Sequence, residues 1–595
     1  MNDSSSKLNY RNISFQNSLK IASWFLYVTL AILIGTLTWS SFRGIDITDE
    51  SFYLLGYIHG IKPTSGFSYF HIIFTQFFGF LNLSIPEIRI GAIVLQLLCS
   101  GLFSHSIVLF LRRGNLIKNE KWHFHFAFAT IAIGAFLAYS WLPQVPSYNT
   151  FSSLILQMIV TCYLYAQVVK SNTYRCVLYG ILGFLLLVSF FNKFPNLVTS
   201  IACIVIYSLL MPTQRTWSKK LIPNLQGLSA ALLGGALFAL FMFGGKAYQE
   251  VSSYAQSIIS PRGMGSSGNY IDIYLLDFLN LMIRTSPYLI IIILFGVFFI
   301  LPKRFRNYKL ANIFQKYIPL ILLALFALIN ESYIGGSEKK YFLFDIYFLG
   351  IFLFGSFLIT NAGPNKHEKY KIVMFALLIL SFLFGSLGTG NALTVQFMSY
   401  GAFIFAAFTV VSFSLKDKVQ VVVICLLLCI ASAQIVTAIT LQPYKEAHGA
   451  GAQNIKVNLS RFGDLKVDSA KNNLIHQLAE IRNMDADYMF TYSAQSGLIL
   501  FSEKKPYAFG WCEEDPVICT KLIEKEQQVS PERIIFIIPD KLEMDSSMQL
   551  ALATNGIEFP MEYMLLKQIG YIDCQFGGYR VVNVFVHNSV TGDTP

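Results

Sequence analysis

Residues 21–41 read IASWFLYVTLAILIGTLTWSS, and residues 44–53 follow as GIDITDESFY. The first stretch is apolar over roughly the 20 residues that a helix needs to cross the hydrocarbon core of a bilayer. The second places three carboxylates, Asp46, Asp49 and Glu50, just beyond the end of that helix. Ionisable side chains are costly beside a bilayer and are kept where they have a task. The junction therefore predicts a first membrane span followed by a functional loop.

The composition extends this prediction to most of the chain. Of the 595 residues 54% are hydrophobic and only 13% are charged, where a soluble protein has about 25% charged residues. Lys and Arg exceed Asp and Glu by 31 to 14 in residues 1–440, whereas acids exceed bases by 20 to 14 in residues 441–595. The basic excess thus belongs to membrane-proximal loops, where it sets topology. No soluble part carries the basic stripe of a nucleic-acid-binding protein.

The distribution of apolar stretches predicts a polytopic α-helical membrane protein with about thirteen spans. They lie at 21–41, 88–111, 124–142, 150–169, 176–192, 195–211, 225–243, 286–302, 317–334, 341–360, 371–387, 397–415 and 418–440. One set of alternate loops holds 22 Lys and Arg and the other holds 8. The positive-inside rule therefore makes residues 1–20 cytoplasmic and places loops 41–87 and 244–286 on the outer face of the cytoplasmic membrane.

Two outer segments do not read as spans. Residues 49–82 contain an aromatic run at 67–80 that is too short to cross, and it predicts interfacial helices. Residues 244–286 contain a Gly- and Ser-rich stretch around Arg262 and then an amphipathic stretch at 270–284. A mobile lid and a simple connector are both compatible with that pattern.

The tail at 441–595 predicts an extracytoplasmic α/β domain outside a membrane module at 21–440. Strands are expected at 488–492, 506–509, 533–538 and 579–586, with helices at 496–502 and 546–555. Cys512 and Cys519 can form a disulfide in an oxidising compartment or remain free thiols. Their spacing does not match a zinc site.

Four groups of polar residues are expected on the outer side. Asp49 and Glu50 are candidates for a base that deprotonates a hydroxyl or amine, or they only cap a helix. Glu87 is a candidate ligand for a divalent metal (Mg, Mn or Zn), and Asp49 is a second candidate ligand. Arg89 then binds a phosphate or holds the acidic loop, unless Glu87 and Arg89 form a self-contained ion pair.

The other two groups are cationic. Lys193 either extends its ammonium to the membrane surface or clamps a phosphate. Lys339 and Lys340, with Tyr341 beside them, break the charge pattern of the outer side, which favours an anionic lipid phosphate as partner. Arg262 is counted with these phosphate-binding candidates.

The order of these motifs resembles the GT-C glycosyltransferases, which include the bacterial aminoarabinose transferases and the protein O-mannosyltransferases. Asp49-Glu-x-x-Tyr53 after the first span, Glu87-x-Arg89 at the second, Asn192-Lys193-Phe-Pro195, and Ser337-x-x-Lys340-Tyr341 carry the likeness. The resemblance implies inverting transfer from a polyprenyl-phosphate sugar, with Asp49 as the base and Lys193, Lys340 and Tyr341 at the donor phosphate. Residues 143–150 contain no carboxylate where the family often has one, and Phe follows Lys193 in place of Gly.

The sequence thus predicts a membrane glycosyltransferase that transfers a sugar from a polyprenyl-phosphate donor to an envelope glycan, lipid or protein. A transporter or flippase of lipid-linked glycans and a non-catalytic envelope assembly protein are the alternatives. Transporters commonly show internal repeats and interrupted helices at mid-membrane. The candidate residues here lie instead at the outer ends of the spans.

Overall fold

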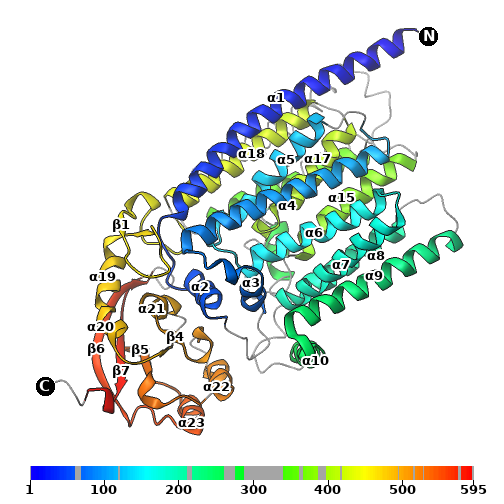
Figure 1. The fold of residues 1–595 in the computed structure, drawn as a ribbon. Helices are drawn as coiled ribbons and strands as arrows, with labels where there is room; N and C mark the ends of the chain where they lie inside the picture. The colour runs from blue at the N-terminus through cyan, green and yellow to red at the C-terminus, as the bar shows by residue number, and fades with distance from the viewer. Residues whose placement is uncertain are drawn as a thin grey trace.

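The computed structural model describes most of the chain. The described residues are 2–60, 69–117, 121–210, 217–259, 275–283, 285–286, 339–360, 366–385, 397–415, 418–441, 443–492, 495–512, 516–526, 528–573 and 578–591. They form a long helical bundle with a smaller α/β domain at one end, and the two chain termini lie at opposite ends of the molecule (Figure 1).

The bundle is built from helices that run side by side (Figure 1). They are α1 (Asn2–Ser41), α4 (Ile85–Arg113), α5 (Lys121–Phe136) continued by η2 (Leu137–Ser140), α6 (Tyr148–Val168), α7 (Asn172–Asn192), α8 (Phe194–Leu210), α9 (Trp217–Phe243), α14 (Lys339–Thr360), α15 (Lys366–Gly385), α17 (Gly401–Leu415) and α18 (Lys418–Thr440). Small residues permit the closest crossings, as is usual in membranes. A Cβ on Gly401 of α17 would lie 2.3 Å from the carbonyl oxygen of Gly134 in α5.

Within the described residues, seven helices are long and apolar enough to cross a membrane, and shorter apolar helices accompany them. The chain is therefore a multi-pass α-helical membrane protein with a C-terminal α/β domain, as the sequence predicts. The expected spans at 286–302, apart from Ser286, and at 317–334 lie outside the described residues.

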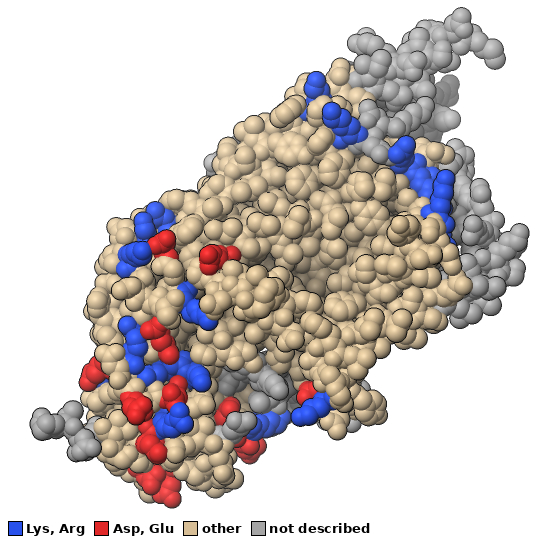
Figure 2. Space-filling view, in the orientation of Figure 1, with Lys and Arg blue, Asp and Glu red and all other residues tan. Residues whose placement is uncertain are grey.

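Charge follows the same division. In Figure 2 Lys and Arg gather at the end of the bundle remote from the α/β domain, both signs of charge cover that domain, and an uncharged belt lies between. Such a belt is expected of a surface that meets lipid. Large apolar side chains exposed on α1, α4 and α9, including Trp24, Leu98 and Leu232, fit that environment.

The segment between α1 and α4 contains two short helices, α2 (Asp49–His59) and α3 (Phe70–Phe78), and then η1 (Gly79–Leu81). The prediction that no span occurs here is confirmed for the described part. Both helices lie between the bundle and the α/β domain (Figure 1). They pack tightly, because a Cβ on Gly56 of α2 would meet the His71 ring of α3 at 2.0 Å.

The C-terminal domain contains a five-stranded mixed sheet in the order β4-β3-β5-β7-β6. The strands are β3 (Tyr488–Thr491), β4 (Lys505–Pro506), β5 (Ile534–Pro539), β6 (Tyr563–Asp573) and β7 (Gly578–His587); β3 is parallel to β4 and β5, and the pairs with β7 are antiparallel. The helices are α19 (Ser469–Gln477), α20 (Ala479–Asn483), α21 (Ser496–Phe501), α22 (Pro516–Glu524) and α23 (Ser546–Thr554). A small antiparallel pair, β1 (Ile455–Lys456) with β2 (Lys466–Val467), precedes them.

The predicted strand at 506–509 is wrong beyond Pro506. Residues Ala508–Gly510 form the 3-10 helix η5, and Ala508 and Gly510 both have positive φ, which ends the extended run. Strand β6 has no counterpart among the predicted strands.

The α/β domain shares a hydrophobic core with the first outer loop. Ile45 and Leu54 from that loop are buried in one cluster with Leu498 and Val584 of the domain. The backbone joins them as well, since the Gly44 amide donates to the Lys466 carbonyl at 2.8 Å and the Gly497 amide donates to the Ile47 carbonyl at 2.6 Å. Burial of apolar surface on both sides fixes the domain to the loop.

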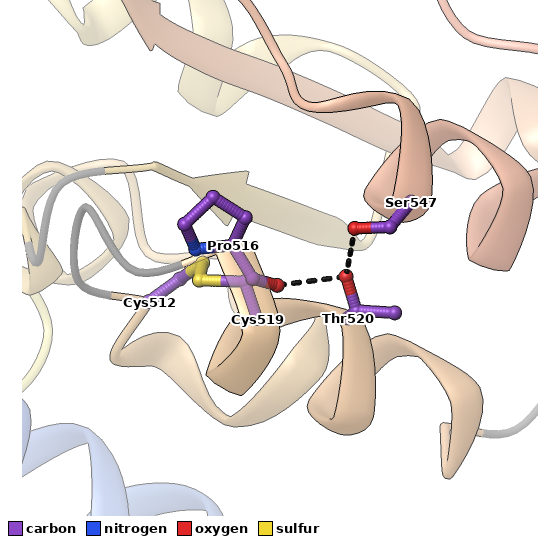
Figure 3. The surroundings of a disulfide bond; sticks show 5 residues. All are labelled: Cys512, Pro516, Cys519, Thr520 and Ser547. Carbon is purple, nitrogen blue, oxygen red and sulfur yellow. Dashed lines mark hydrogen bonds between the residues drawn. A yellow bond between two sulfur atoms is a disulfide. The ribbon is translucent and has the colours of Figure 1, made fainter. Parts of the chain in front are cut away.

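Cys512 and Cys519 form a disulfide that attaches the start of α22 to the preceding segment (Figure 3). Beside it, the Thr520 hydroxyl donates to the Pro516 carbonyl and contacts the Ser547 hydroxyl of α23. Trp511 then packs on Phe52 of α2, with ring centroids 5.0 Å apart. The disulfide region therefore lies against the helix that begins at Asp49.

Candidate functional site

The turn that leads into α2 is organised by Asp46. Its carboxylate accepts hydrogen bonds from the Thr48 amide at 3.0 Å, the Thr48 hydroxyl at 2.9 Å and the Glu50 amide at 3.1 Å. Thr48 occupies the N-cap position without a side-chain cap bond, so Asp46 satisfies the free amides at the helix start. Burial raises the pKa of Asp46 to about 6, and the Lys445 ammonium opposes that rise.

Glu50 is paired with Arg89 in the interior. The Arg89 Nε donates to one Glu50 oxygen at 2.9 Å and an Nη donates to the other at 2.8 Å, and both side chains are buried. The remaining guanidinium donors meet the backbone carbonyls of Ser41, Arg43 and Gly44. All five N–H groups of Arg89 are therefore used, so the geometry assigns Arg89 to holding the acidic loop and not to a phosphate. The same pairing leaves Glu50 no free oxygen with which to act as a base.

Asp49 has a different environment one residue earlier. Its side chain is 24% exposed, and its Oδ2 accepts from the Lys445 ammonium at 2.6 Å and from the Tyr444 hydroxyl. Tyr444 and Lys445 lie in the segment that links α18 to the α/β domain. No donor from the described part of the chain reaches Oδ1, which leaves that oxygen available to a substrate.

Glu87 caps the start of α4. It is exposed, and it accepts from the amide and the hydroxyl of Ser84 at 2.7 Å in a capping box at the start of α4. Across the described ranges, no three His, Cys, Asp or Glu side chains are placed to hold a metal ion. The geometry thus gives Glu87 a capping role at the start of α4, and the metal-binding role of Glu87 and Asp49 stays a prediction.

Lys193 joins α7 to α8 and is 5% exposed. Its ammonium donates to the Gly385 carbonyl at the end of α15 at 3.2 Å and lies 5.8 Å from the centroid of the Tyr400 ring. No carboxylate forms an ion pair with it within the described residues, and burial lowers the pKa of Lys193 to about 7. An ammonium buried with no carboxylate partner among the described residues is costly, so an anion placed beside it would be stabilising. It does not extend to the membrane surface in this arrangement.

The start of α6 lies between the two groups. The side-chain amide of Asn192, the residue before Lys193, donates to the Tyr148 backbone carbonyl at 3.1 Å. The centroids of the Tyr148 ring and the Tyr53 ring of α2 are 6.3 Å apart. Burial raises the pKa of Tyr53 well above its ordinary value, and the nearby Tyr148 and the Asp49 charge add to that rise. Tyr53, Tyr148 and Asn192 therefore form an aromatic and amide layer between the acidic and basic groups.

The remaining predicted residues are not tested by this structure. Arg262 lies outside the described residues, and Lys339, Lys340 and Tyr341 begin α14 with side chains outside the description. Their phosphate-binding role stays a prediction.

Sequence reasoning missed Tyr444 and Lys445. No local signal marks Lys445, which is one of 14 Lys and Arg residues in 441–595. Its contact with Asp49 joins positions almost 400 residues apart, and only the fold brings them together.

Comparisons with known proteins give a fold likeness only. No protein-family model matches the chain, and no curated protein matches it in sequence. Two solved structures align over 96% of the chain: ArnT from Cupriavidus metallidurans bound to undecaprenyl phosphate (99% of that chain, TM-score 0.40, 12% identity), and the same protein in the apo state (100%, TM-score 0.37, 12% identity). Similarity at this level does not assign a reaction.

Proposed function

We propose that this protein is a membrane glycosyltransferase of the GT-C type that uses a polyprenyl-phosphate sugar and modifies an envelope glycan, lipid or protein. Asp49 Oδ1 would accept the proton of the acceptor hydroxyl or amine as that atom bonds to the anomeric carbon. The bond from that carbon to the phosphate oxygen breaks, and its electron pair leaves with the polyprenyl phosphate. No redox step or nucleotide is needed.

One observation carries this proposal. The Asp49 side chain is partly exposed and keeps one carboxylate oxygen free, whereas both carboxylate oxygens of its neighbour Glu50 bind Arg89. A general base must be able to reach the proton that it removes. Lys193 supplies a buried cation at the other end of the same aromatic layer, which suits the charge of a leaving phosphate.

We place the reaction on the outer face of the cytoplasmic membrane. The Cys512–Cys519 disulfide supports an oxidising compartment for the α/β domain. The basic end of the bundle in Figure 2 is then cytoplasmic. A divalent metal remains an untested addition to this scheme.

The test begins with a deletion strain whose envelope glycans, lipids and proteins are compared with the wild type by mass spectrometry. A missing sugar mass names the product, and membranes carrying each variant are then assayed for that transfer. We expect Asp49→Asn to lower the rate by about 100-fold or more at normal expression. Asp464→Asn, which alters an exposed carboxylate of the α/β domain, should retain full activity. Full transfer by Asp49→Asn would disprove the base assignment, and an unchanged envelope in the deletion strain would disprove the function.

A further inference from the structure

The segment that follows the last span reaches back to Asp49. Tyr444 and Lys445 both bind Oδ2 of that carboxylate, and the Lys445 ammonium also donates to the Thr48 hydroxyl at 3.1 Å. Because both donors bind the same oxygen, they fix the rotation of the Asp49 carboxylate about its Cβ–Cγ bond. The direction of the second oxygen, Oδ1, is therefore fixed as well.

The backbone of this segment is strained at the contact. Lys445 has a φ of 50°, a left-handed conformation that a residue with a side chain rarely adopts. Such strain persists where surrounding contacts over-determine it, and it gathers at functional sites. Here both neighbours of Lys445 are held: Tyr444 binds Asp49, and Glu446 pairs with Lys471.

The next residue attaches the segment to the α/β domain. Glu446 is buried and forms an ion pair with Lys471 of α19. The Asp468 carboxylate caps α19 through the Lys471 amide at 2.8 Å. Residues 444–446 therefore connect the candidate base directly to the first helix of the domain.

We infer that Tyr444 and Lys445 are positioning residues of the transfer reaction, and that through them the α/β domain orients the Asp49 carboxylate. This inference rests on the proposed role of Asp49. The Tyr444 hydroxyl and the Lys445 ammonium hold Oδ2 and direct Oδ1 toward the acceptor. The domain is then part of the catalytic unit and not an independent binding module.

Several other groups face Asp49 and set its electrostatic environment. They are Asp46 of the same loop, Tyr53 of α2, Tyr148 of α6, and Tyr444 and Lys445 themselves. Lys445 is the only cation in that set. Loss of its charge should therefore raise the pKa of Asp46 further, because the Lys445 ammonium lowers it.

The test compares Lys445→Met, Tyr444→Phe and Lys445→Arg with the wild type, using the transfer reaction identified from the deletion strain. We expect Lys445→Met and Tyr444→Phe to lower kcat by about 10- to 100-fold with little change in KM, because a displaced base affects the chemical step. Lys445→Arg, which keeps a cationic donor at this position, should restore most of the lost kcat. Lys456→Met, in an exposed ion pair with Asp464, is the matched control.

Folding is checked separately by gel filtration and thermal unfolding in detergent, and rates are normalised to folded protein. Wild-type kcat in Lys445→Met and Tyr444→Phe, with Asp49→Asn inactive, would overturn this inference and leave the proposed function intact. Full activity of Asp49→Asn would disprove both the role of Asp49 as the base and this inference.

Discussion

Arg89 of α4 binds Glu50 of α2 through both carboxylate oxygens and, with its remaining donors, holds three backbone carbonyls of the turn after α1. One buried guanidinium thus sets the position of the whole acidic loop relative to the bundle. Because both oxygens of Glu50 bind Arg89, Asp49 is the carboxylate of this pair that keeps an oxygen free to contact a substrate.

Removal of Arg89 should damage the fold more than it damages a binding step. We expect Arg89→Met to destabilise the protein by about 3–5 kcal/mol, because Glu50 is left buried and unpaired. Thermal unfolding in detergent measures this change, and the double variant Arg89→Met with Glu50→Leu should recover part of the loss. A normal unfolding temperature for Arg89→Met, combined with weaker donor binding, would restore the phosphate-binding role.

Lys193 should behave in the opposite way. Lys193→Met removes a buried cation that has no carboxylate partner in the described residues, so stability should stay equal or rise. Affinity for undecaprenyl phosphate should fall by about 10- to 100-fold, the value of a charged hydrogen bond. Native mass spectrometry with that lipid measures the change. Lys371→Met is the control, because Lys371 is also buried but lies near the opposite end of α15 from Gly385. Equal losses in the two variants would contradict a specific site at Lys193.

The docking of the α/β domain depends on Gly497. A Cβ at this position would lie 2.7 Å from the Ile47 Cα, and backbone cannot give way as a side-chain end can. We expect Gly497→Val to cost about 1–3 kcal/mol or more and to expose the 443–454 segment to protease. Gly451→Val is the control, since a Cβ there meets nothing within 4 Å. Equal protease resistance of the two variants would show that the contact does not hold the domain.

Stability should depend on the protonation of Glu446. Burial raises the pKa of Glu446 to about 7 from an ordinary value of 4.5, while Lys471 opposes the rise. The folded state thus binds this proton more tightly than the unfolded state, so the contribution is complete below about pH 4.5 and is lost as pH rises through 7.

In Glu446→Gln this loss cannot occur. We expect its unfolding temperature to fall less than that of the wild type between pH 5 and pH 8. The free energy of unfolding of the two proteins should differ in slope by at most about 1.4 kcal/mol per pH unit. Thermal unfolding in detergent across that range provides the comparison. Parallel curves would show that folding does not raise the pKa of Glu446.

Local pattern was sufficient for many of the elements. The apolar lengths of α1, α4 and α18 predict spans, and the unbroken apolar run of Ile534–Pro539 predicts the fully buried strand β5. Strand β6 escaped prediction because its polar and apolar residues do not alternate regularly, and its register shifts between Leu565 and Lys567. A bulge of this kind changes which residues face the core.

The site was predictable only in part. The scarcity of carboxylates drew attention to the loop at Asp49 and Glu50, but adjacent residues on a helix point about 100° apart. Which of the two meets Arg89 is decided by the packing of α4 against α2. The partners Tyr444 and Lys445 come from the far end of the chain, and no local pattern connects them with Asp49.

The sequence by itself determined that this is a multi-pass membrane protein with an α/β tail and an acidic first loop, because hydrophobic length, charge bias and residue alternation are local properties. The tertiary structure alone decided that Glu50 is structural and that Asp49 keeps one free oxygen. It also decided that the tail shares a core with the loop. Those facts depend on which surfaces are buried together, and burial is a property of the whole fold.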